Sequence, residues 1–456
     1  MSARVADKDV RVPAILLSTF AMKNSADAIY NSSKMGYVSL FAFSAFSGVI
    51  YYFSNPKPNH FYDYTFRVAG NMLNGSIAFT EKQPNWLNEF VPFEGFYYSV
   101  FPLGGVLTMI PFAALEAAGL IELMPAAFIA AMSASVICFF LLQIAHRYEV
   151  STGRRFLTTL GVLFGTWMWT NLTMGGAWQL ALGFAVIGEL GAIYFTVYNR
   201  KPLLAGLFFA LAFGNRTEVL LTAPMFMYLL IRPASGAIEK DKGDRIKDKA
   251  DNPDFSLLDS KNPAAIDPDS VRRLFAFCSV PFVLGVATLL YNYVRFQSFT
   301  DFGYARIPGV LSEPWYNHGI FSVYYIPRQA WEMLLKAWEW KSAFPYLVPN
   351  GFSGSILWSS PFLLFAVRFG SRDRMLKYTS WLSITILTFI LWTHGNSGGW
   401  QFGYRYAMVL LPWLFVILLE SAPKNITILE WTAFIFSVAA NAYATWLFHW
   451  SEYVKP

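Results

Sequence analysis

A single carboxylate among aromatic rings is the first feature of the sequence that suggests chemistry. In NHFYDYTFRVAGNMLNG, residues 59–75, Asp63 lies between Tyr62 and Tyr64, and Arg67 follows four residues later. Aromatic neighbours withdraw water from a carboxylate and raise its pKa, which suits a general base, and a carboxylate is also a metal ligand. The same i,i+4 spacing is that of a helix-surface ion pair, so catalysis and simple pairing with Arg67 both stay open.

A second acid, Glu94, lies in FVPFEGFYYSVFPLGG, residues 90–105. The proline and glycines that follow it would open the top of a helix and let a ligand approach the backbone. The alternative interpretation is a turn glutamate at a helix entry, with Tyr97 and Tyr98 as anchors at the membrane interface.

The composition places both acids in a membrane protein. The chain has 456 residues, of which 55% are hydrophobic, 18% aromatic and only 14% charged, with a mean hydropathy of +0.38. A soluble domain carries about 25% charged residues. Cys138 and Cys278 are too few for a disulfide framework, and the five histidines show no metal-ligand spacing. The net charge of +6 forms no basic stripe that would indicate nucleic-acid binding.

Apolar runs predict an all-α polytopic membrane protein. A bilayer core is crossed by about 20 apolar residues, and the runs predict a bundle of about 10–12 transmembrane helices with two large outer loops. The run 203–231 fits one long span or two short ones. The predicted spans are 36–54, 101–120, 125–145, 156–173, 178–198, 203–231, 275–295, 355–369, 378–394, 406–420 and 428–449.

Two long loops and one charged insertion divide the chain. Residues 55–100 and 297–354 are rich in aromatics, proline and glycine, and predict ordered loops with short helices at the membrane surface. Residues 232–273 hold nine basic and nine acidic residues, which predicts a solvated cytoplasmic linker. The predicted parts are a cytoplasmic or interfacial N-terminus (1–35), a front transmembrane module (36–231), the linker (232–273) and a back transmembrane module (274–456).

Basic residues predict the orientation. RFGSRDRMLK, residues 368–377, is expected in the cytoplasm together with the linker, which places both large loops and residues 393–405 outside. The basic segments 146–155 and 199–201 conflict with a simple count of spans. They are cytoplasmic only if 203–231 is a hairpin with GNRTEV at its tip and the number of spans between 101 and 145 changes by one.

The order of several motifs resembles that of the GT-C-type membrane glycosyltransferases. The resemblance is to the branch related to dolichyl-phosphate-mannose protein mannosyltransferases and the lipid A aminoarabinose transferase. It covers most of residues 36–420. The motifs that carry it are FYDYTFRVAGNMLNG, GFYYSVFPLGGVLTMIPF, GLFFALAFGNRTEVLLTAPMFMYLL (206–230), YNYVRFQSFTDFGY (291–304), GSILWSSPFLLFAV (354–367) and GGWQFGYRYAMVLLPWLFV (398–416).

The resemblance implies an enzyme of the plasma (inner) membrane that moves a sugar from a polyprenyl-phosphate carrier to an acceptor on the extracytoplasmic face, with inversion. The acceptor is a lipid, a glycan or a protein, and nucleic acid is not a partner. Asp63 is then the general base and Glu94 the second acidic candidate. No cofactor is firmly implied, and a divalent metal ion is left open.

The leaving phosphate of such a donor needs cations. Arg405, in FGYRY at the outer end of a late span, is the first candidate, because a guanidinium binds phosphate oxygens bidentately. Arg295 and Arg306 would assist, and Arg216 joins them if the hairpin forms. The alternatives are an interfacial anchor for Arg405 and an ion pair with Asp301 for Arg306.

Aromatic residues of the same loops would contact the sugar or the acceptor. Tyr97, Tyr98 and Trp400 could stack on a sugar face, although interfacial anchoring is the better explanation for each of them. His394 and Asn396 lie close to Arg405 in the sequence and would line the acceptor side.

Two other classes of protein compete with this prediction. A lipid or polysaccharide transporter would show internal repeats and binding groups at mid-membrane, and the acid that fits this class is Glu189. A non-catalytic scaffold of the cell envelope would tolerate Asp63→Asn.

Overall fold

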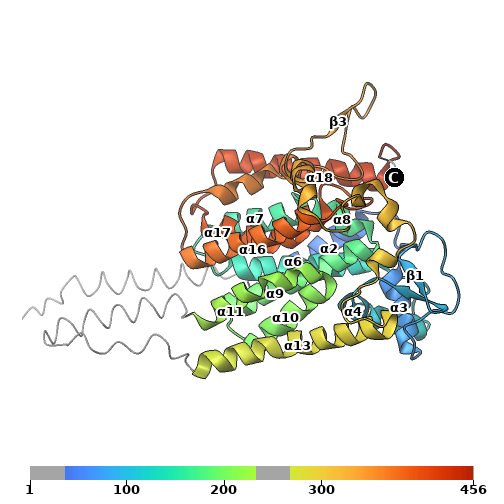
Figure 1. The fold of residues 1–456 in the computed structure, drawn as a ribbon. Helices are drawn as coiled ribbons and strands as arrows, with labels where there is room; N and C mark the ends of the chain where they lie inside the picture. Colours follow the sequence, from blue (N-terminus) through green and yellow to red (C-terminus); the bar gives the residue numbers. More distant parts are fainter. Residues whose placement is uncertain (1–35, 233–267, 455–456) are drawn as a thin grey trace, which may run out of the picture. The chain divides into compact units, whose positions relative to one another are not determined.

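The computed structural model describes residues 36–232 and 268–454, drawn in Figure 1. The described chain is almost entirely helical, and its strands form two small hairpins. The described residues from 43 onward form one compact unit, and the other unit, residues 1–42, is described from residue 36, directly before α2 (Tyr37–Phe53). The predicted segment 1–35 and residues 233–267 of the predicted linker lie outside the described residues.

Four described helices are long and apolar enough to cross a membrane. They are α6 (Ala126–Ala145), α9 (Ala177–Ile193) continued by η1 (Tyr194–Tyr198), α13 (Pro268–Phe296) and α16 (Arg374–Thr393). α18 (Ile428–Trp450) has a similar length. The chain is therefore an all-α multi-pass membrane protein, as the sequence predicts.

Other segments between the two ends of the bundle are built from shorter pieces. Proline or glycine at their junctions breaks the regular helix. They are α7 (Thr152–Phe164) with α8 (Met168–Met174), α10 (Pro202–Asn215), η2 (Thr217–Thr222) with α11 (Ala223–Ile231), α15 (Ile356–Ser359) with η7 (Pro361–Val367), and η8 (Arg405–Leu410) with α17 (Leu411–Glu420).

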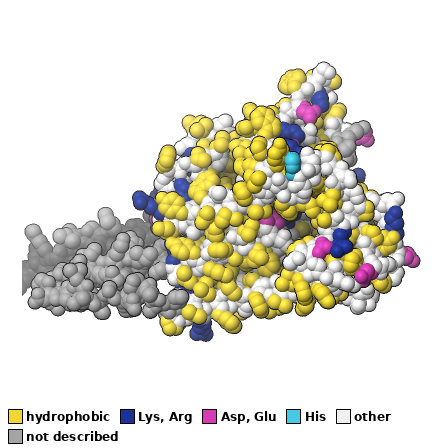
Figure 2. Space-filling view, in the orientation of Figure 1, with side chains coloured by type: hydrophobic (Ala, Val, Ile, Leu, Met, Phe, Trp, Pro, Cys, Tyr) yellow, Lys and Arg dark blue, Asp and Glu magenta, His cyan; other side chains and the backbone are white. Residues whose placement is uncertain are grey.

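The sides of the helices expose apolar residues. Only 11% of the apolar window of α13 is buried, and Phe275 and Phe282 are 77% and 71% exposed. Figure 2 shows apolar side chains over the middle of the face drawn, with charged side chains toward its ends. Surface of this kind is stable in lipid and not in water, so these faces meet the bilayer.

The two ends of the bundle differ in charge. The loop end, defined here as residues 55–125, 297–354 and 394–404, carries acids and bases in mixture. The basic end, defined as residues 146–155, 199–201, 232, 268–273, 368–377 and 421–427, is dominated by lysine and arginine. Its basic residues are Arg147, Arg154, Arg155, Arg200, Lys201, Arg232, Arg272, Arg273, Arg368, Arg372, Arg374, Lys377 and Lys424.

The segment 203–231 is a helical hairpin. α10 ends at Asn215, Arg216 is extended (φ −138°, ψ 97°), and η2 and α11 return toward the starting end. The Arg200 guanidinium, just before α10, donates to the carbonyl oxygens of Leu230 and Arg232 at the end of α11 (2.8 Å each). The basic segments 146–155 and 199–201 therefore lie at one end, as the hairpin alternative required.

The span predicted at 101–120 is wrong. Its residues form two short helices, α4 (Leu103–Leu107) and α5 (Ile110–Ala117), and α5 packs on α3 (Tyr64–Leu73) of the first loop. The following helix, α6, starts at the same end, because the Ala127 amide donates to the Pro58 carbonyl (2.9 Å). The apolar content suggested a span, but the break at Thr108–Met109 and Gly119 (φ +72°) end both helices early.

A β-hairpin orders the first loop. β1 (Phe90–Phe93) pairs antiparallel with β2 (Phe96–Ser99), with Phe90 opposite Ser99. Glu94 and Gly95 make the turn with positive φ angles of 47° and 83°. The fully buried Arg295 of α13 holds the end of the hairpin through the carbonyl oxygens of Ser99 and Phe101.

The second loop is also ordered and lies against residues 394–403. The Gln329 amide donates to the His394 carbonyl (2.8 Å), and the Gly354 amide donates to the Gly403 carbonyl (2.8 Å). Its elements are η3 (Tyr304–Arg306), η4 (Val310–Ser312), η5 (Pro314–Tyr316), η6 (Val323–Tyr325), α14 (Ile326–Leu334), β3 (Glu339–Trp340) and β4 (Leu347–Val348). Preceding the loop, α13 already begins at Pro268, inside the stretch predicted to be linker.

The corrected path of residues 101–125 can be tested by cysteine labelling. In a chain with Cys138 and Cys278 replaced by alanine, we expect Glu81→Cys and Glu122→Cys to react with a membrane-impermeant maleimide from the same side in intact cells. Glu149→Cys, at the basic end, should react from the opposite side. All three positions are exposed. Labelling of Glu122→Cys together with Glu149→Cys would mean that residues 101–120 do cross the membrane.

Candidate active site

Charged and aromatic side chains from separate parts of the chain meet at the loop end. We refer to them as the Glu89 cluster. Its members are Glu89 from the first loop, Trp178 at the start of α9, Arg216 at the tip of the α10–α11 hairpin, Tyr304 from the second loop, and His394, Arg405 and Tyr406 from the segment that follows α16.

Glu89 is the acid of this cluster. It immediately precedes β1, and both of its carboxylate oxygens accept from the indole Nε1–H of Trp178 (3.0 and 2.8 Å). Burial raises the pKa of Glu89 to about 7, although the Trp178 hydrogen bond and the positive charge of Arg405 act in the opposite direction. A carboxyl group with a pKa near 7 can accept a proton and release it again under physiological conditions.

Arg405 lies on the same indole. Its guanidinium carbon is 5.7 Å from the centre of the Trp178 ring, and the side chain is part of a residue only 5% exposed. Within residues 36–232 and 268–454 it has no carboxylate at ion-pair distance, and its Nε has no acceptor. A buried guanidinium without an anion is costly, and the terminal nitrogens of Arg405 have only two long hydrogen bonds in the described residues, to the Trp400 carbonyl (3.4 Å) and the Tyr406 hydroxyl (3.5 Å).

The local backbone explains why Arg405 keeps its position. Arg405 opens the 3-10 helix η8 after the extended residue Tyr404 (φ −129°, ψ 89°). Its amide donates to the side-chain oxygen of Gln401 (2.8 Å), and Gln401 is fully buried. The backbone therefore fixes the base of the side chain, and the guanidinium is left to face Trp178 and Tyr406.

Arg216 adds a second guanidinium. It lies 4.8 Å from the centre of the Tyr406 ring, and Arg405 lies 5.2 Å from the same centre. Arg216 is paired with Glu218, whose carboxylate oxygen is 2.6 Å from its Nη2. The Tyr406 ring thus contacts two guanidinium groups. Arg216 has an acidic partner, and Arg405 has none among the described residues.

His394 completes the cluster as a neutral imidazole. Its Nδ1 lies 2.7 Å from the Asn396 carbonyl oxygen, which can only accept, so Nδ1 carries the proton. Burial lowers the pKa of His394, and the charges of Arg216 and Arg405 lower it further. Nε2 is then an unprotonated acceptor, and the centre of the imidazole ring lies 6.1 Å and 5.9 Å from the ring centres of Tyr304 and Tyr406.

Asp63 lies beside the cluster and has a different partner. Its carboxylate is 2.6 Å from the Arg67 Nε, which is the helix ion pair that the spacing allows. Burial raises the pKa of Asp63, and Arg67 opposes this shift. The neighbouring tyrosines, Tyr62 and Tyr64, both pack on Trp178 with ring centres 5.1 and 5.2 Å away. Asp63 is therefore connected to Trp178 through the two tyrosines that flank it.

The remaining charged candidates lie outside the cluster. Glu94 is exposed at the turn of the hairpin and accepts from Gln297 (2.8 Å). Arg306 pairs with Asp301 (2.7 Å), which is the simpler of its two predicted roles. Arg295 is fully buried and directs its donors at backbone carbonyls, where it holds the first loop in place.

The aromatic candidates are spread over the loop end. Tyr97 pairs by its backbone with Phe79, and Tyr98 packs on Phe296 at 5.9 Å. The Trp400 ring packs on Phe448 at 5.0 Å, and its carbonyl oxygen accepts from Arg405 at 3.4 Å. Of these three, Trp400 is the one in direct contact with the cluster.

One solved structure is similar to the chain over most of its length. It is the crystal structure of the Archaeoglobus fulgidus oligosaccharyltransferase in the apo form, with 10% sequence identity and a TM-score of 0.42. The match covers 91% of this chain and 56% of that chain, so this chain spans just over half of that enzyme's length. That enzyme is of the GT-C type, the class that the sequence motifs resemble. No protein-family model and no curated protein matches the chain.

Several residues of the Glu89 cluster were not predicted from the sequence. Glu89, in NWLNEFVPF, resembles an ordinary loop acid, and Trp178 and Tyr304 resemble interfacial aromatics. The sequence feature that could have indicated Glu89 is its position directly before an aromatic strand. Among the described residues no group of three His, Cys, Asp or Glu side chains gathers as metal ligands.

The raised pKa of Glu89 predicts a pH-dependent stability. A carboxyl group whose pKa is higher in the folded than in the unfolded protein stabilises the fold at low pH, and this stabilisation is lost as the pH rises through the folded value. Between pH 5 and pH 8 we therefore expect the melting temperature of the purified protein to fall more steeply than that of Glu89→Gln. Glu94→Gln, which removes an exposed acid of the same hairpin, should follow the unaltered protein. Parallel curves for all three proteins would contradict the shifted pKa.

Proposed function

We propose that this chain is a membrane glycosyltransferase of the GT-C kind. It takes a sugar from a polyprenyl-phosphate carrier and transfers it to a hydroxyl group of an acceptor on the extracytoplasmic side. The observation that carries the proposal is the shared contact of Glu89 and Arg405 with Trp178. It combines a proton acceptor with a pKa of about 7 and a buried guanidinium without an acidic partner among the described residues.

Glu89 serves as the general base in this proposal. It accepts the proton of the acceptor hydroxyl while that oxygen attacks the anomeric carbon of the sugar. The bond between this carbon and the phosphate oxygen breaks, and its electron pair leaves with the polyprenyl phosphate. One such displacement inverts the anomeric carbon. Asp63, whose pKa burial also raises, is the alternative base.

Arg405 binds the phosphate of the donor and stabilises the charge that develops on it. Two guanidinium groups beside one ring, Arg405 and Arg216, offer several N–H donors to phosphate oxygens. Trp178 and Tyr406 are half-buried and provide faces against which a sugar can lie. His394, with its free Nε2, lines the acceptor side.

The membrane position suits a lipid-linked donor. Basic segments of membrane proteins remain in the cytoplasm, so the basic end is assigned there and the Glu89 cluster to the extracytoplasmic side. The carrier's apolar tail can then stay in the bilayer beside the lipid-facing helices while its phosphate reaches Arg405.

The experiment that tests this function measures the free lipid phosphate. Purified protein is incubated with a panel of polyprenyl-phosphate sugars and a membrane extract that supplies acceptors, and released polyprenyl phosphate is quantified. A transferase releases it only when an acceptor is present. Movement of the intact lipid-linked sugar between leaflets, with no release, would indicate a transporter. Neither release nor movement with any donor would contradict both functions.

Substitution of Glu89 tests the base. We expect Glu89→Gln to lower the transfer rate by at least about 100-fold, because a positioned general base contributes a factor of about 10² to 10⁴. The donor should still bind with nearly unchanged affinity. The measurement is the initial rate of polyprenyl phosphate release at saturating donor.

Asp63→Asn is the matched comparison for this base. The substitution removes the other carboxylate of raised pKa in the first loop and should lower the rate by less than Glu89→Gln. A larger loss of rate in Asp63→Asn than in Glu89→Gln would identify Asp63 as the general base. Melting temperatures of both variants exclude a folding defect.

Substitution of Arg405 tests the phosphate site. We expect Arg405→Gln to weaken donor binding by at least about tenfold, since a hydrogen bond to a charged group contributes about 1.5–3 kcal/mol. The KM for the acceptor should change much less. Arg306→Gln is the control, because it removes an exposed arginine of the same end that is already paired with Asp301. Equal weakening of donor and acceptor by Arg405→Gln would show that the arginine only supports the fold.

A further inference from the structure

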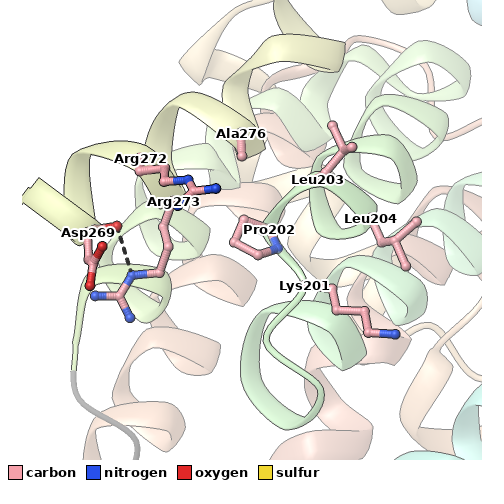
Figure 3. Close-up of a pocket in the computed structure, with 8 residues that line it drawn as sticks. All are labelled: Lys201, Pro202, Leu203, Leu204, Asp269, Arg272, Arg273 and Ala276. Carbon is pink, nitrogen blue, oxygen red and sulfur yellow. Dashed lines mark hydrogen bonds between the residues drawn. The ribbon is translucent and has the colours of Figure 1, made fainter.

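A cavity of about 540 Å³ lies at the basic end, the opposite end of the bundle from the Glu89 cluster. It opens between residues 201–204, at the start of α10, and residues 269–276, at the start of α13. Figure 3 shows Arg272 and Arg273 reaching from α13 and Lys201 from the segment before α10. The cavity is broad enough for the polar group of a small ligand.

The cavity is lined by more positive than negative charge. Lys201, Arg272 and Arg273 line it, and Asp269 is the one acid among the described lining residues. The Lys201 and Arg272 side chains are exposed and have no hydrogen bond or ion pair within the described ranges 36–232 and 268–454. Burial lowers the pKa of the neighbouring Arg200, and the positive charge of Arg273 lowers it further, which shows how closely these cations gather. An anion fits this arrangement.

The rest of the lining is apolar and continues onto a lipid-facing surface. Leu203, Leu204 and Ala276 form the floor of the cavity. Leu203 is 55% exposed, and the next apolar residues along both helices, Leu207 and Phe275, are 50% and 77% exposed. A ligand in this cavity therefore meets cations at one side and bilayer-facing hydrocarbon at the other.

The two helices that form the cavity are held close together. α10 and α13 pack along each other, and Gly206 of α10 is in such close contact with the Phe277 backbone of α13 that a side chain at position 206 would collide with it. Small residues allow this approach in membrane helices. The cations on α13 consequently keep a fixed distance from those before α10.

From these contacts we infer that the cavity between α10 and α13 is a binding site for an anionic phospholipid of the bilayer. The phosphodiester lies at Arg272 and Arg273 on the α13 side of the cavity, the headgroup fills the cavity toward Lys201 on the other side, and the acyl chains follow the exposed apolar faces of Leu207 and Phe275. Basic clusters next to membrane helices attract anionic headgroups in this way. The site is separate from the proposed donor site and does not depend on the proposed function.

The apolar floor distinguishes a lipid from a free phosphate. A soluble anion would use the three cations and gain nothing from Leu203, Leu204 and Ala276. A phospholipid uses both, because its glycerol and upper acyl carbons lie where these residues are. The inferred order of affinity is phosphatidylglycerol first, with phosphatidylcholine and inorganic phosphate both much weaker.

Native mass spectrometry of the full chain in detergent tests this site. The protein is titrated with phosphatidylglycerol or phosphatidylcholine, and the dissociation constant of the first bound lipid is measured. We expect phosphatidylglycerol to bind more tightly. The double variant Lys201→Gln/Arg272→Gln should bind it roughly 25-fold more weakly, since each basic side chain near an anionic lipid contributes about a factor of five. Ala276→Phe, which fills the cavity and keeps every charge, should also weaken binding.

Arg374→Gln/Lys424→Gln is the matched control, because it removes two exposed basic residues of the same end outside the cavity. Its phosphatidylglycerol affinity should stay within about twofold of the unaltered protein. Equal losses in the two double variants would show attraction to general surface charge and overturn the site. Displacement of phosphatidylglycerol by an equimolar amount of inorganic phosphate would also overturn it, in favour of a free-anion site.

Discussion

The buried guanidinium of Arg295 is the constraint on which the loop end depends. A fully buried charge is stabilised by the acceptors around it. Both terminal nitrogens of Arg295 have acceptors, which are the carbonyl oxygens of Ser99 and Phe101 and the side-chain oxygen of Asn292, while its Nε has none among the described residues. Ser99 lies opposite Phe90 in the hairpin, and Glu89 immediately precedes Phe90. The arginine predicted to bind phosphate therefore has a prior role, which is to fix the strand that presents Glu89.

Trp178 connects the first loop to the rest of the Glu89 cluster. The amide of Ala177 donates to the Tyr62 carbonyl (2.9 Å), so the start of α9 is bound to the first loop. The indole then offers its N–H to Glu89 and its face to Arg405. Because one rigid ring contacts both charged groups, the distance between them is set by the indole and not by two flexible side chains.

Much of the fold follows from the sequence, because hydrophobic length and charge are local properties. The runs that became α6, α9, α13, α16 and α18 could be predicted, and positive charge identified the basic end. Residues 101–120 were mispredicted because apolar content was counted while the Thr108–Met109 break and Gly119 were not. The hairpin at 203–231 stayed open because its apolar run fits one long span as well as two short ones, and Gly214, beside the turn at Arg216, does not by itself end a helix.

The candidate site was only partly predictable. Arg405, Arg216 and His394 were named from their types and their positions at span ends, and they lie in the cluster. Glu89 was missed because its significance depends on Trp178, which is 89 positions away in the sequence. A contact of this kind leaves no periodicity or spacing in a single sequence, whereas the pairing of Asp63 with Arg67 does.

α18 forms hydrogen bonds with Ser54, which follows α2, and with residues of α8. Trp450 donates to the Ser54 carbonyl (2.8 Å), His449 contacts Thr173 (2.9 Å), and Thr445 contacts Thr170 (2.9 Å). During synthesis Ser54, Thr170 and Thr173 therefore acquire these partners only after α18 has been made. Arg405 also emerges more than 300 residues after Glu89. A nascent chain consequently lacks the assembled Glu89 cluster until the segment that carries Arg405 has been made and inserted.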